Sequence, residues 1–321
     1  MRKNEKIYVA GHTGLVGSAI LRRLREQGFQ NVVTRSHREL DLLDGHAVTA
    51  FFHEQRPQHV ILAAARVGGI RANDLFPTEF IRENLLIQTN VIHQAYVHGA
   101  DSFLFLGSSC IYPRECPQPI REEYLLTGPL EKTNSAYAVA KIAGIEMCHA
   151  YNRQHGTKYV CVMPTNLYGS NDNFDLETSH VLPAMIRKFH DGKISGGPVT
   201  LWGSGTPRRE FLHAEDMADA CLLILSQPQE RLQSVFKAGE PPLINIGWGE
   251  DLTIAELAQL MAEMIGYKGR IEWDRSKPDG TPRKLLDISR LKSLGWTPRI
   301  PLREGIQQVY ARFQQKAAVA Q

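Results

Sequence analysis

The chain contains 321 residues, of which 43% are hydrophobic and 22% charged, a balance typical of an enzyme with one large domain and a smaller one appended. A net charge of +3 is too small to favour nucleic acid as a partner. No apolar run approaches the roughly 20 residues that span a bilayer, the first residues lack a signal-peptide pattern, and the five cysteines are scattered without a CxxC pair. We therefore expect a cytoplasmic protein that binds no nucleic acid and has no membrane span, disulfide framework or metal site.

A glycine-rich loop follows the first predicted strand, the apolar run at residues 7–10, and leads into a helical pattern from residue 15. Its GxxGxxG spacing permits a tight turn, a close approach of the backbone to a pyrophosphate, and close packing of helix on strand. We therefore predict that a dinucleotide binds to this loop, which consists of Gly11, His12, Thr13, Gly14, Leu15, Val16 and Gly17.

Basic residues follow the second predicted strand, at residues 32–34, where NAD-binding enzymes often place an acid that holds the ribose 2′-hydroxyl. Arg35, His37 and Arg38 suit a 2′-phosphate instead. The cluster favours NADP(H) as the cofactor, and the alternative is a solvated basic turn.

Strands and helices alternate through the first half of the chain. Helices are predicted at residues 47–55 and 79–98, and further strands at 59–65, 103–106 and 159–163. This alternation predicts an α/β fold with a Rossmann-type, doubly wound parallel sheet. We assign residues 1–170 to an NADP-binding domain, to which a strand and a helix return from about residues 199–250. Residues 171–321 are assigned mostly to a smaller α/β substrate-binding domain.

The second half has a looser pattern. It predicts helices at residues 181–190 and 216–225, a surface turn at 193–198, strands at 199–202 and 244–246, and an exposed loop at 227–242. Thr253 is the expected N-cap of a helix that ends near residue 265. A strand at 270–273, a polar loop at 277–284 and two closing helices complete the chain.

Tyr137 and Lys141 are four residues apart on a predicted helix, so their side chains share one face. An ammonium beside a phenol favours the phenolate and lowers the pKa of the tyrosine, which could then exchange protons near neutral pH. The alternative is a core tyrosine with a solvated lysine. The glycine loop and Ser108, which follows the fourth strand, belong to the same sheet edge, and this favours a catalytic pair.

Six motifs in order extend this picture: AAARVGGI at residues 63–70, LGSSCIYP at 106–113, PTNLYG at 164–169, WGSGTP at 202–207, REFLH at 209–213 and KPDGTPRK at 277–284. With GxxGxxG, Ser108 and the Tyr137/Lys141 pair, the chain resembles the extended short-chain dehydrogenase/reductases over essentially its whole length. Within that superfamily it resembles the GDP-L-fucose synthase family. The resemblance implies NADPH-dependent conversion of GDP-4-keto-6-deoxy-D-mannose to GDP-L-fucose, through epimerisation at C3 and C5 and reduction of the C4 ketone.

The resemblance also implies roles for individual residues. Cys110 is the implied base and His180 the implied acid of the epimerisation. The alternatives are a small buried cysteine and a helix-capping histidine. Tyr137, Lys141 and Ser108 are the implied reductive group. Further implied cofactor contacts are Asp41, Leu42, Leu106, Gly107, Ser108, Ser109, Lys141, Pro164, Thr165, Asn166, Leu167 and His180.

Substrate contacts implied by the resemblance are Lys188, Trp202, Arg209 and Asp279. Two positions depart from the family pattern, because Lys188 stands where an arginine is common and Thr13 where some relatives carry an arginine for the 2′-phosphate. Family members are commonly homodimers, and helices near residues 79–98 and 135–155 are the expected contact.

Two other functions remain as alternatives. A nucleotide-sugar 4-epimerase or 4,6-dehydratase would recycle a bound NAD, but a dehydratase is expected to carry an Asp-Glu pair where this chain has Ser109 and Cys110. A non-catalytic NADP-binding regulator on the same fold usually lacks the tyrosine or the lysine of the pair, and both are present here.

Overall fold

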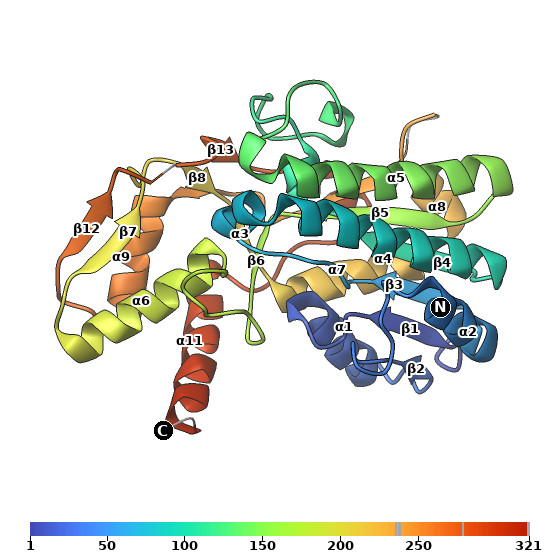
Figure 1. The fold of residues 1–321 in the computed structure, drawn as a ribbon, viewed down its shortest axis with the longest axis horizontal. Coiled ribbons are helices and arrows are strands. Elements are labelled where there is room, and N and C mark those ends of the chain that lie inside the picture. Colours follow the sequence, from blue (N-terminus) through green and yellow to red (C-terminus); the bar gives the residue numbers. More distant parts are fainter. Residues whose placement is uncertain (235, 237–238, 278, 320–321) are drawn as a thin grey trace.

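The structure, a computed structural model, describes residues 1–234, 236, 239–277 and 279–319 (Figure 1). At its centre is a parallel six-stranded sheet with the order β10-β5-β4-β3-β1-β2. The strands are β1 (Ile7–Ala10), β2 (Val32–Val33), β3 (His59–Leu62), β4 (Ser102–Leu106), β5 (Tyr159–Pro164) and β10 (Leu243–Ile246). The predicted α/β, doubly wound fold is confirmed.

Helices cover both faces of the sheet because alternate residues of each buried strand point to opposite sides. Ile7 and Val9 of β1 pack in one core with α1 (Leu15–Glu26) and α7 (Ala214–Ser226). Tyr8 and Ala10 pack in the other core. That face carries α2 (Gly45–Gln55), α4 (Pro77–Val97) and α5 (Ser135–His155), and α4 and α5 run side by side along it (Figure 1).

A further core, separate from the two that flank the sheet, lies at one end of the sheet, on the left in Figure 1. It is enclosed by α6 (Val181–Ser195), α9 (Ile254–Ile265), α11 (Leu302–Val319) and the parallel pair β7 (Val199–Trp202) and β12 (Ile271–Asp274). Thr253 caps α9 as predicted, and its side chain and that of Glu256 form a reciprocal capping box.

Short strands connect the core around α6, α9 and α11 with the large sheet. β6 (Asn166–Tyr168) pairs with β9 (Phe211–His213), and β8 (Arg208–Arg209) lies between β11 (Leu252–Thr253) and β13 (Arg283–Lys284). β10 is a strand of the large sheet and α7 packs against that sheet. The chain therefore returns to the large sheet after it has formed β7. α10 (Ser289–Ser293) also returns, and its Leu291 packs in the core of α1 and α7. The domain boundary near residue 170 stays a prediction.

Several local predictions were wrong. α6 continues to Ser195 and ends at Gly196 in the left-handed conformation, so the first part of the predicted turn at 193–198 is helical. The predicted loop at 227–242 contains α8 (Gln229–Gln233), which begins after Pro228; residues 235 and 237–238 of this loop lie outside the described residues. An unpredicted helix, α3 (Ile70–Leu75), precedes α4, and β3 ends at Leu62. Residue 278 of the predicted polar loop also lies outside the description.

None of the helices in the described part of the chain combines the length and apolarity that crossing a bilayer requires.

A buried carboxylate at the amino end of the sheet, that of Glu5, predicts acid sensitivity. The carboxylate of Glu5 accepts hydrogen bonds from the backbone N–H and the Nε of Arg2, at 2.5 and 2.8 Å, and lies 2.9 Å from His59 Nε2. These contacts, the Arg2 backbone bond foremost, lower the pKa of Glu5 to about 2. Because this value is below the roughly 4.3 of an unfolded chain, the stabilisation is present above pH ~4.3 and is lost as pH falls towards 2.

We therefore expect Glu5→Gln to lower the free energy of unfolding at pH 7, and the difference from the parent to shrink between about pH 4 and 2. Urea unfolding across this range measures it. Glu54→Gln, at an exposed position on α2, is the control and should shift stability little. A difference between Glu5→Gln and the parent that stays constant down to pH 2 would contradict the assignment.

Candidate active site

Tyr137 and Lys141 lie on α5 beside the carboxyl end of β4, as their spacing predicts. Both are buried. Lys141 Nζ donates a hydrogen bond to the carbonyl oxygen of Leu106 at 2.8 Å and lies 5.8 Å from the centre of the Tyr137 ring. Gly144, one turn further along α5, allows this approach, since a Cβ there would lie 2.5 Å from the Phe105 ring. The tight contact between α5 and β4 therefore fixes the pair against the sheet.

Burial sets the charge state of this pair. It raises the pKa of Tyr137, Cys110 raises it further, and a hydrogen bond with Ser108 opposes the change. Burial also lowers the pKa of Lys141 to about 7. The prediction that Lys141 lowers the pKa of Tyr137 is thus wrong for this structure, because the packing that aligns the two side chains also removes both from water. The phenol is protonated at neutral pH and can donate its proton.

The surroundings of Tyr137 come from α4 and include residues that the sequence analysis missed. The Phe80 ring meets Tyr137 edge-on, with centroids 6.1 Å apart. Asn84 holds the loop after β3, since its Oδ1 accepts from the N–H of Arg66 and its Nδ2 donates to the Arg66 carbonyl oxygen, both at 3.0 Å. Gln88 Nε2 donates to the carbonyl oxygen of Ala140 at 2.6 Å. The sequence did hold a signal for Asn84 and Gln88, because they are polar residues four positions apart on a helix face that is otherwise buried.

Cys110 follows β4 in a short 3₁₀ turn (Ser109–Ile111) and is half-buried. Its N–H donates to Ser108 Oγ at 3.2 Å. Two donors face its sulfur: Asn134 Nδ2 at 3.3 Å and Lys284 Nζ at 3.7 Å. The sequence predicted a role for neither, although Lys284 ends the motif KPDGTPRK. A sulfur with an amide and an ammonium in contact differs from the inert, apolar environment of a core cysteine.

His180 occupies the N-cap position of α6, but its side chain makes no capping hydrogen bond. The loop before it packs on the loop after β3: Gly69 N–H donates to the Thr178 carbonyl oxygen at 3.1 Å, and a Cβ on Gly69 would lie 2.7 Å from the Ser179 oxygen. The ring is open to solvent at its edge, yet the protein around it lowers its pKa through desolvation, and the charge of Lys284 lowers it further. Lys284 thus contacts the sulfur of Cys110 and acts electrostatically on His180.

The glycine loop between β1 and α1 has the predicted form. Gly11 has a φ of +84°, and a Cβ there would lie 2.6 Å from the backbone N of Ala64. A Cβ on Gly17 would lie 2.1 Å from the Gly11 oxygen, so helix and loop touch through glycine alone. Gly14 begins α1 without a side-chain cap, and the buried Nδ1 of His12 has no partner. This geometry fits a dinucleotide whose pyrophosphate accepts from the N-terminal N–H groups of α1.

The predicted 2′-phosphate cluster lies at the end of β2. Arg35 is half-buried, with its guanidinium 5.5 Å from the centre of the Phe51 ring and Nη1 donating to the Thr34 carbonyl oxygen at 2.9 Å. His37 and Arg38 are exposed, and His37 Nδ1 lies 3.7 Å from Asp41 Oδ1. The basic groups are therefore presented at the surface beside the glycine-loop strand, where a 2′-phosphate would need them.

The other predicted cofactor residues follow the sheet edge. Leu106 is the last residue of β4, Gly107 follows it, and Ser109 begins the 3₁₀ turn; a Cβ on Gly107 would lie 2.1 Å from Met163 Cε. Pro164 ends β5, and Leu167 lies in β6. Thr165 Oγ1 and Asn166 Nδ2 donate to the Glu210 carbonyl oxygen at 3.2 and 2.9 Å, so their side chains fix the sheet edge to β9. Leu42 packs with the core under α2.

Trp202, one of the predicted substrate residues, is 40% exposed. Lys188 Nζ and Lys277 Nζ lie 5.9 and 5.7 Å from its ring centre. Arg209 is placed differently, in β8 opposite Lys284, and burial lowers its pKa. The carboxylate of Asp279 accepts from the N–H and Oγ of Ser204, at 2.7 and 2.9 Å, so Asp279 organises the turn after Trp202. These cations form a positive surface suited to phosphate groups.

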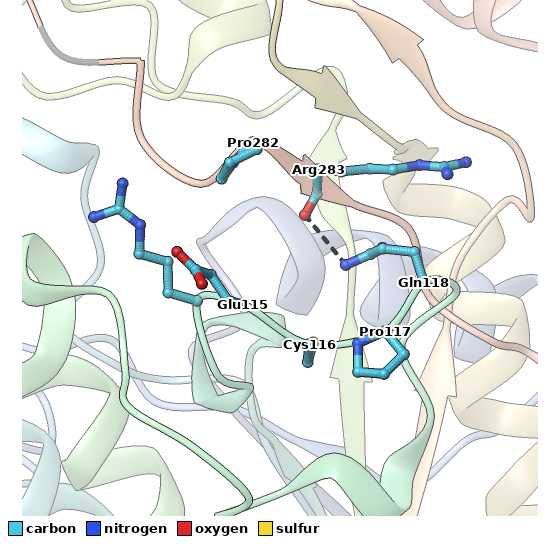
Figure 2. Close-up of a pocket in the computed structure, with 7 residues that line it drawn as sticks. Glu115, Cys116, Pro117, Gln118, Pro282 and Arg283 are labelled. Carbon is cyan, nitrogen blue, oxygen red and sulfur yellow. Dashed lines mark hydrogen bonds between the residues drawn. The ribbon is translucent and has the colours of Figure 1, made fainter.

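β13, formed by Arg283 and Lys284, lies near a segment that follows β4, and Figure 2 shows Arg283 facing Gln118 of that segment. Gln118 Nε2 donates to the Arg283 carbonyl oxygen at 3.3 Å, and Gln118 Oε1 accepts from Leu285 N–H at 3.0 Å. One side chain thus holds the backbone on both sides of Lys284. A hollow on the outer side is lined by Arg114, Glu115, Cys116, Pro117, Gln118, Pro282 and Arg283.

Comparisons with known proteins agree with this geometry. Residues 7–247 match the model of the NAD dependent epimerase/dehydratase family. The chain is 56% identical to GDP-L-fucose synthase 1 of Arabidopsis thaliana over 96% of this chain and 93% of the relative. It is 50% identical to GDP-L-fucose synthase of Escherichia coli over 96% of each chain. A solved GDP-L-fucose synthetase of Naegleria fowleri bound to NADP superimposes with a TM-score of 0.86 at 27% identity, covering 99% of this chain and 96% of that one.

Proposed function

The chain belongs to the NAD-dependent epimerase/dehydratase family, and from this premise we propose that it converts GDP-4-keto-6-deoxy-D-mannose to GDP-L-fucose with NADPH as the reductant. The relatives named GDP-L-fucose synthase match nearly the whole chain. The observation that carries the proposal is that a sulfur held by two donors lies beside the buried tyrosine–lysine pair. One site thus combines groups for moving protons at carbon with groups for protonating an oxygen.

Cys110 and His180 serve the epimerisation. The C4 ketone of the substrate acidifies the C–H bonds at C3 and C5, because the electrons of a broken C–H bond can pass to the ketone oxygen. The Cys110 thiolate takes the proton on one face of the sugar ring and becomes a thiol. His180, in its protonated form, gives a proton to the other face of the same carbon, and the electrons return from oxygen to form the new C–H bond.

Tyr137, Ser108 and Lys141 serve the reduction. NADPH bound at the glycine loop supplies the hydride to C4. Tyr137 donates its phenolic proton to the resulting C4 oxygen, and its raised pKa keeps that proton in place until then. Ser108, which hydrogen-bonds Tyr137, is placed to donate to the same oxygen. Lys141 contacts the Leu106 carbonyl oxygen and is assigned to the cofactor ribose and to orienting the pair.

The diphosphate of the substrate is assigned to Lys188, beside Trp202, and to Arg209 in β8. Arg209 and Lys188 supply positive charge, and Trp202 offers an exposed ring against which the nucleotide can stack. Lys188 is already bonded to the Thr200 carbonyl oxygen at 2.8 Å, so its ammonium acts from a fixed position. We assign Asp279 an indirect part, through the turn that it holds at Ser204.

Arg35 supplies a test of the cofactor assignment. Arg35→Gln removes the charge that the 2′-phosphate would meet and should weaken NADPH binding by roughly 10- to 100-fold, as for a hydrogen bond to a charged group. NADH lacks this phosphate, so its affinity should change little. Titration of intrinsic fluorescence with each cofactor measures both constants, and Arg25→Gln, on the exposed side of α1, is the charge-matched control. Equal losses for the two cofactors would contradict the assignment.

The alternative functions are not favoured. A 4,6-dehydratase is expected to have two acids after β4, and this chain has Ser109 and Cys110 there. A 4-epimerase needs no pair such as Cys110 and His180. A regulator that binds NADP without catalysis has no use for a proton donor, whereas the buried Tyr137 is one.

Incubation of the purified protein with GDP-4-keto-6-deoxy-D-mannose and NADPH tests the proposal. We expect one NADPH to be oxidised for each GDP-L-fucose formed, followed by the absorbance of the reduced nicotinamide and by chromatography of the sugar nucleotide. A protein that leaves NADPH unoxidised with this substrate does not have the proposed function.

We further propose that the protein is a cytoplasmic homodimer that pairs through α4 and α5. Exposed apolar side chains on these helices, Val97 at 53% and Val139 at 45%, support this contact. Light scattering of the eluted protein measures its mass, and a monomer at micromolar concentration would rule the dimer out.

A further inference from the structure

Lys284 is the cation nearest the sulfur of Cys110 that the structure gives, with Nζ 3.7 Å from Sγ. The same ammonium lowers the pKa of His180, the residue assigned to the opposite face of the sugar. Burial raises the pKa of Cys116, and the same ammonium opposes this rise. In the described part of the chain no carboxylate forms an ion pair with Lys284, so its charge acts on these groups without being neutralised.

The backbone of Lys284 is held from several directions. In the β8–β13 pair it lies opposite Arg209. Gln118 bonds the residues before and after it, Arg283 and Leu285, and Figure 2 shows the bond to Arg283. The buried carboxylate of Glu210 accepts from the N–H of Leu286 at 3.1 Å. A surface lysine would lack such anchors, and this rigidity brings the ammonium to the sulfur at little entropic cost.

Asn134 approaches the sulfur from another element, the 3₁₀ turn (Lys132–Asn134) that precedes α5. Its Nδ2 lies 3.3 Å from Sγ. The other ionisable groups near Cys110 are Tyr137, whose pKa Cys110 raises, and Arg209, whose pKa it raises against burial. The sulfur of Cys110 thus has one amide and one ammonium in contact, with the Tyr137 phenol and the Arg209 guanidinium nearby.

We propose that Lys284 is a positioning residue of the epimerising half of the site, which together with Asn134 holds Cys110 as the thiolate and favours proton release from His180. The inference rests on the proposed function for its place in the reaction. When the S–H bond forms, the C–H electrons pass to the ketone oxygen. When His180 then releases its proton to carbon, the ring becomes neutral, which is the form that a neighbouring cation favours.

Alkylation of Cys110 by iodoacetamide as a function of pH tests this without any substrate. Trypsin cleaves after Arg114, so Cys110 and Cys116 fall in different peptides and mass spectrometry follows each one. In Lys284→Met the pH midpoint for Cys110 should rise by about one unit, with roughly tenfold slower alkylation at neutral pH. Lys284→Arg keeps the charge and should restore most of the difference. Lys277→Met, which removes a cation of the same loop near Trp202, is the matched control and should leave the midpoint unchanged.

Asn134→Ala keeps the proposal testable if Lys284→Met does not fold, and it should raise the midpoint by a smaller amount. NADPH binding reports folding in every variant.

Folded variants of both positions with the parent midpoint overturn the proposal, whether or not the protein makes GDP-L-fucose. Absence of NADPH oxidation in the parent overturns the proposed function and leaves the alkylation result standing. The link to epimerisation is overturned if the alkylation midpoint of Cys110 moves but the pH profile of deuterium exchange at C3 and C5 stays the same.

Discussion

Tyr137→Phe is expected to slow NADPH oxidation by roughly 10²- to 10⁴-fold, the range that one general acid contributes, while solvent deuterium still enters C3 and C5 of the substrate. The substitution removes only the phenolic O–H and keeps the ring that packs edge-on against Phe80. Without that proton the C4 oxygen keeps only the hydrogen bond assigned to Ser108, and no acid protonates it when the hydride arrives. Cys110 and His180 are untouched, so the exchange of protons at carbon should persist.

The two activities are separated by measuring both in one variant. NADPH oxidation is followed by absorbance, and deuterium incorporation by mass spectrometry of the recovered sugar nucleotide in D₂O. Tyr112→Phe is the control, because it removes the hydroxyl of another buried tyrosine, bonded at 2.7 Å to Asn245, away from the proposed acid. It should cost stability and leave the ratio of the two activities unchanged. Loss of both activities in Tyr137→Phe would show that the phenol also serves epimerisation.

Cys110→Ser has the converse expected result: at least a hundredfold loss of deuterium exchange with NADPH binding retained. A serine fits the same space and can accept from Asn134, but its hydroxyl is far less acidic than a thiol and gives no anion at neutral pH. Product formation should fall in parallel, since the reduction that yields GDP-L-fucose needs the epimerised sugar.

Cys116→Ser is the matched control for this experiment. Cys116 is also half-buried and near Lys284, and it lines the hollow of Figure 2. We expect exchange at the parent rate in this variant. Unchanged exchange in Cys110→Ser would remove Cys110 from the role of base.

Elements with strong local signals were predictable from the sequence. The glycine loop is an example, since GxxGxxG after a short apolar run specifies strand, turn and helix through steric needs that lie within seven residues. Thr253 was predictable as a helix cap for the same reason, because its partner Glu256 is three residues away. Tyr137 and Lys141 were placed on one helix face by spacing alone.

Other features had no local signal. The sequence pattern missed α3 and the last turn of α6, where the helix ends only at Gly196. It also gave the wrong direction for the pKa of Tyr137. Spacing along a helix fixes which side chains are neighbours, whereas the loss of water around them depends on Phe80 and the strands that α5 covers.

The sequence by itself determined the fold class, the cofactor loop, the Tyr137/Lys141 pair and the identity of Cys110 and His180 as candidates. Only the tertiary structure decided what faces the sulfur: Lys284 is 174 residues away along the chain and Asn134 is 24. The physical reason is that hydrogen-bonding periodicity acts over one or two turns of chain, while the electrostatics of a site depend on distances in space. Those distances are set by the pairing of β13 with β8 and by the hydrogen bonds of Gln118 to both neighbours of Lys284.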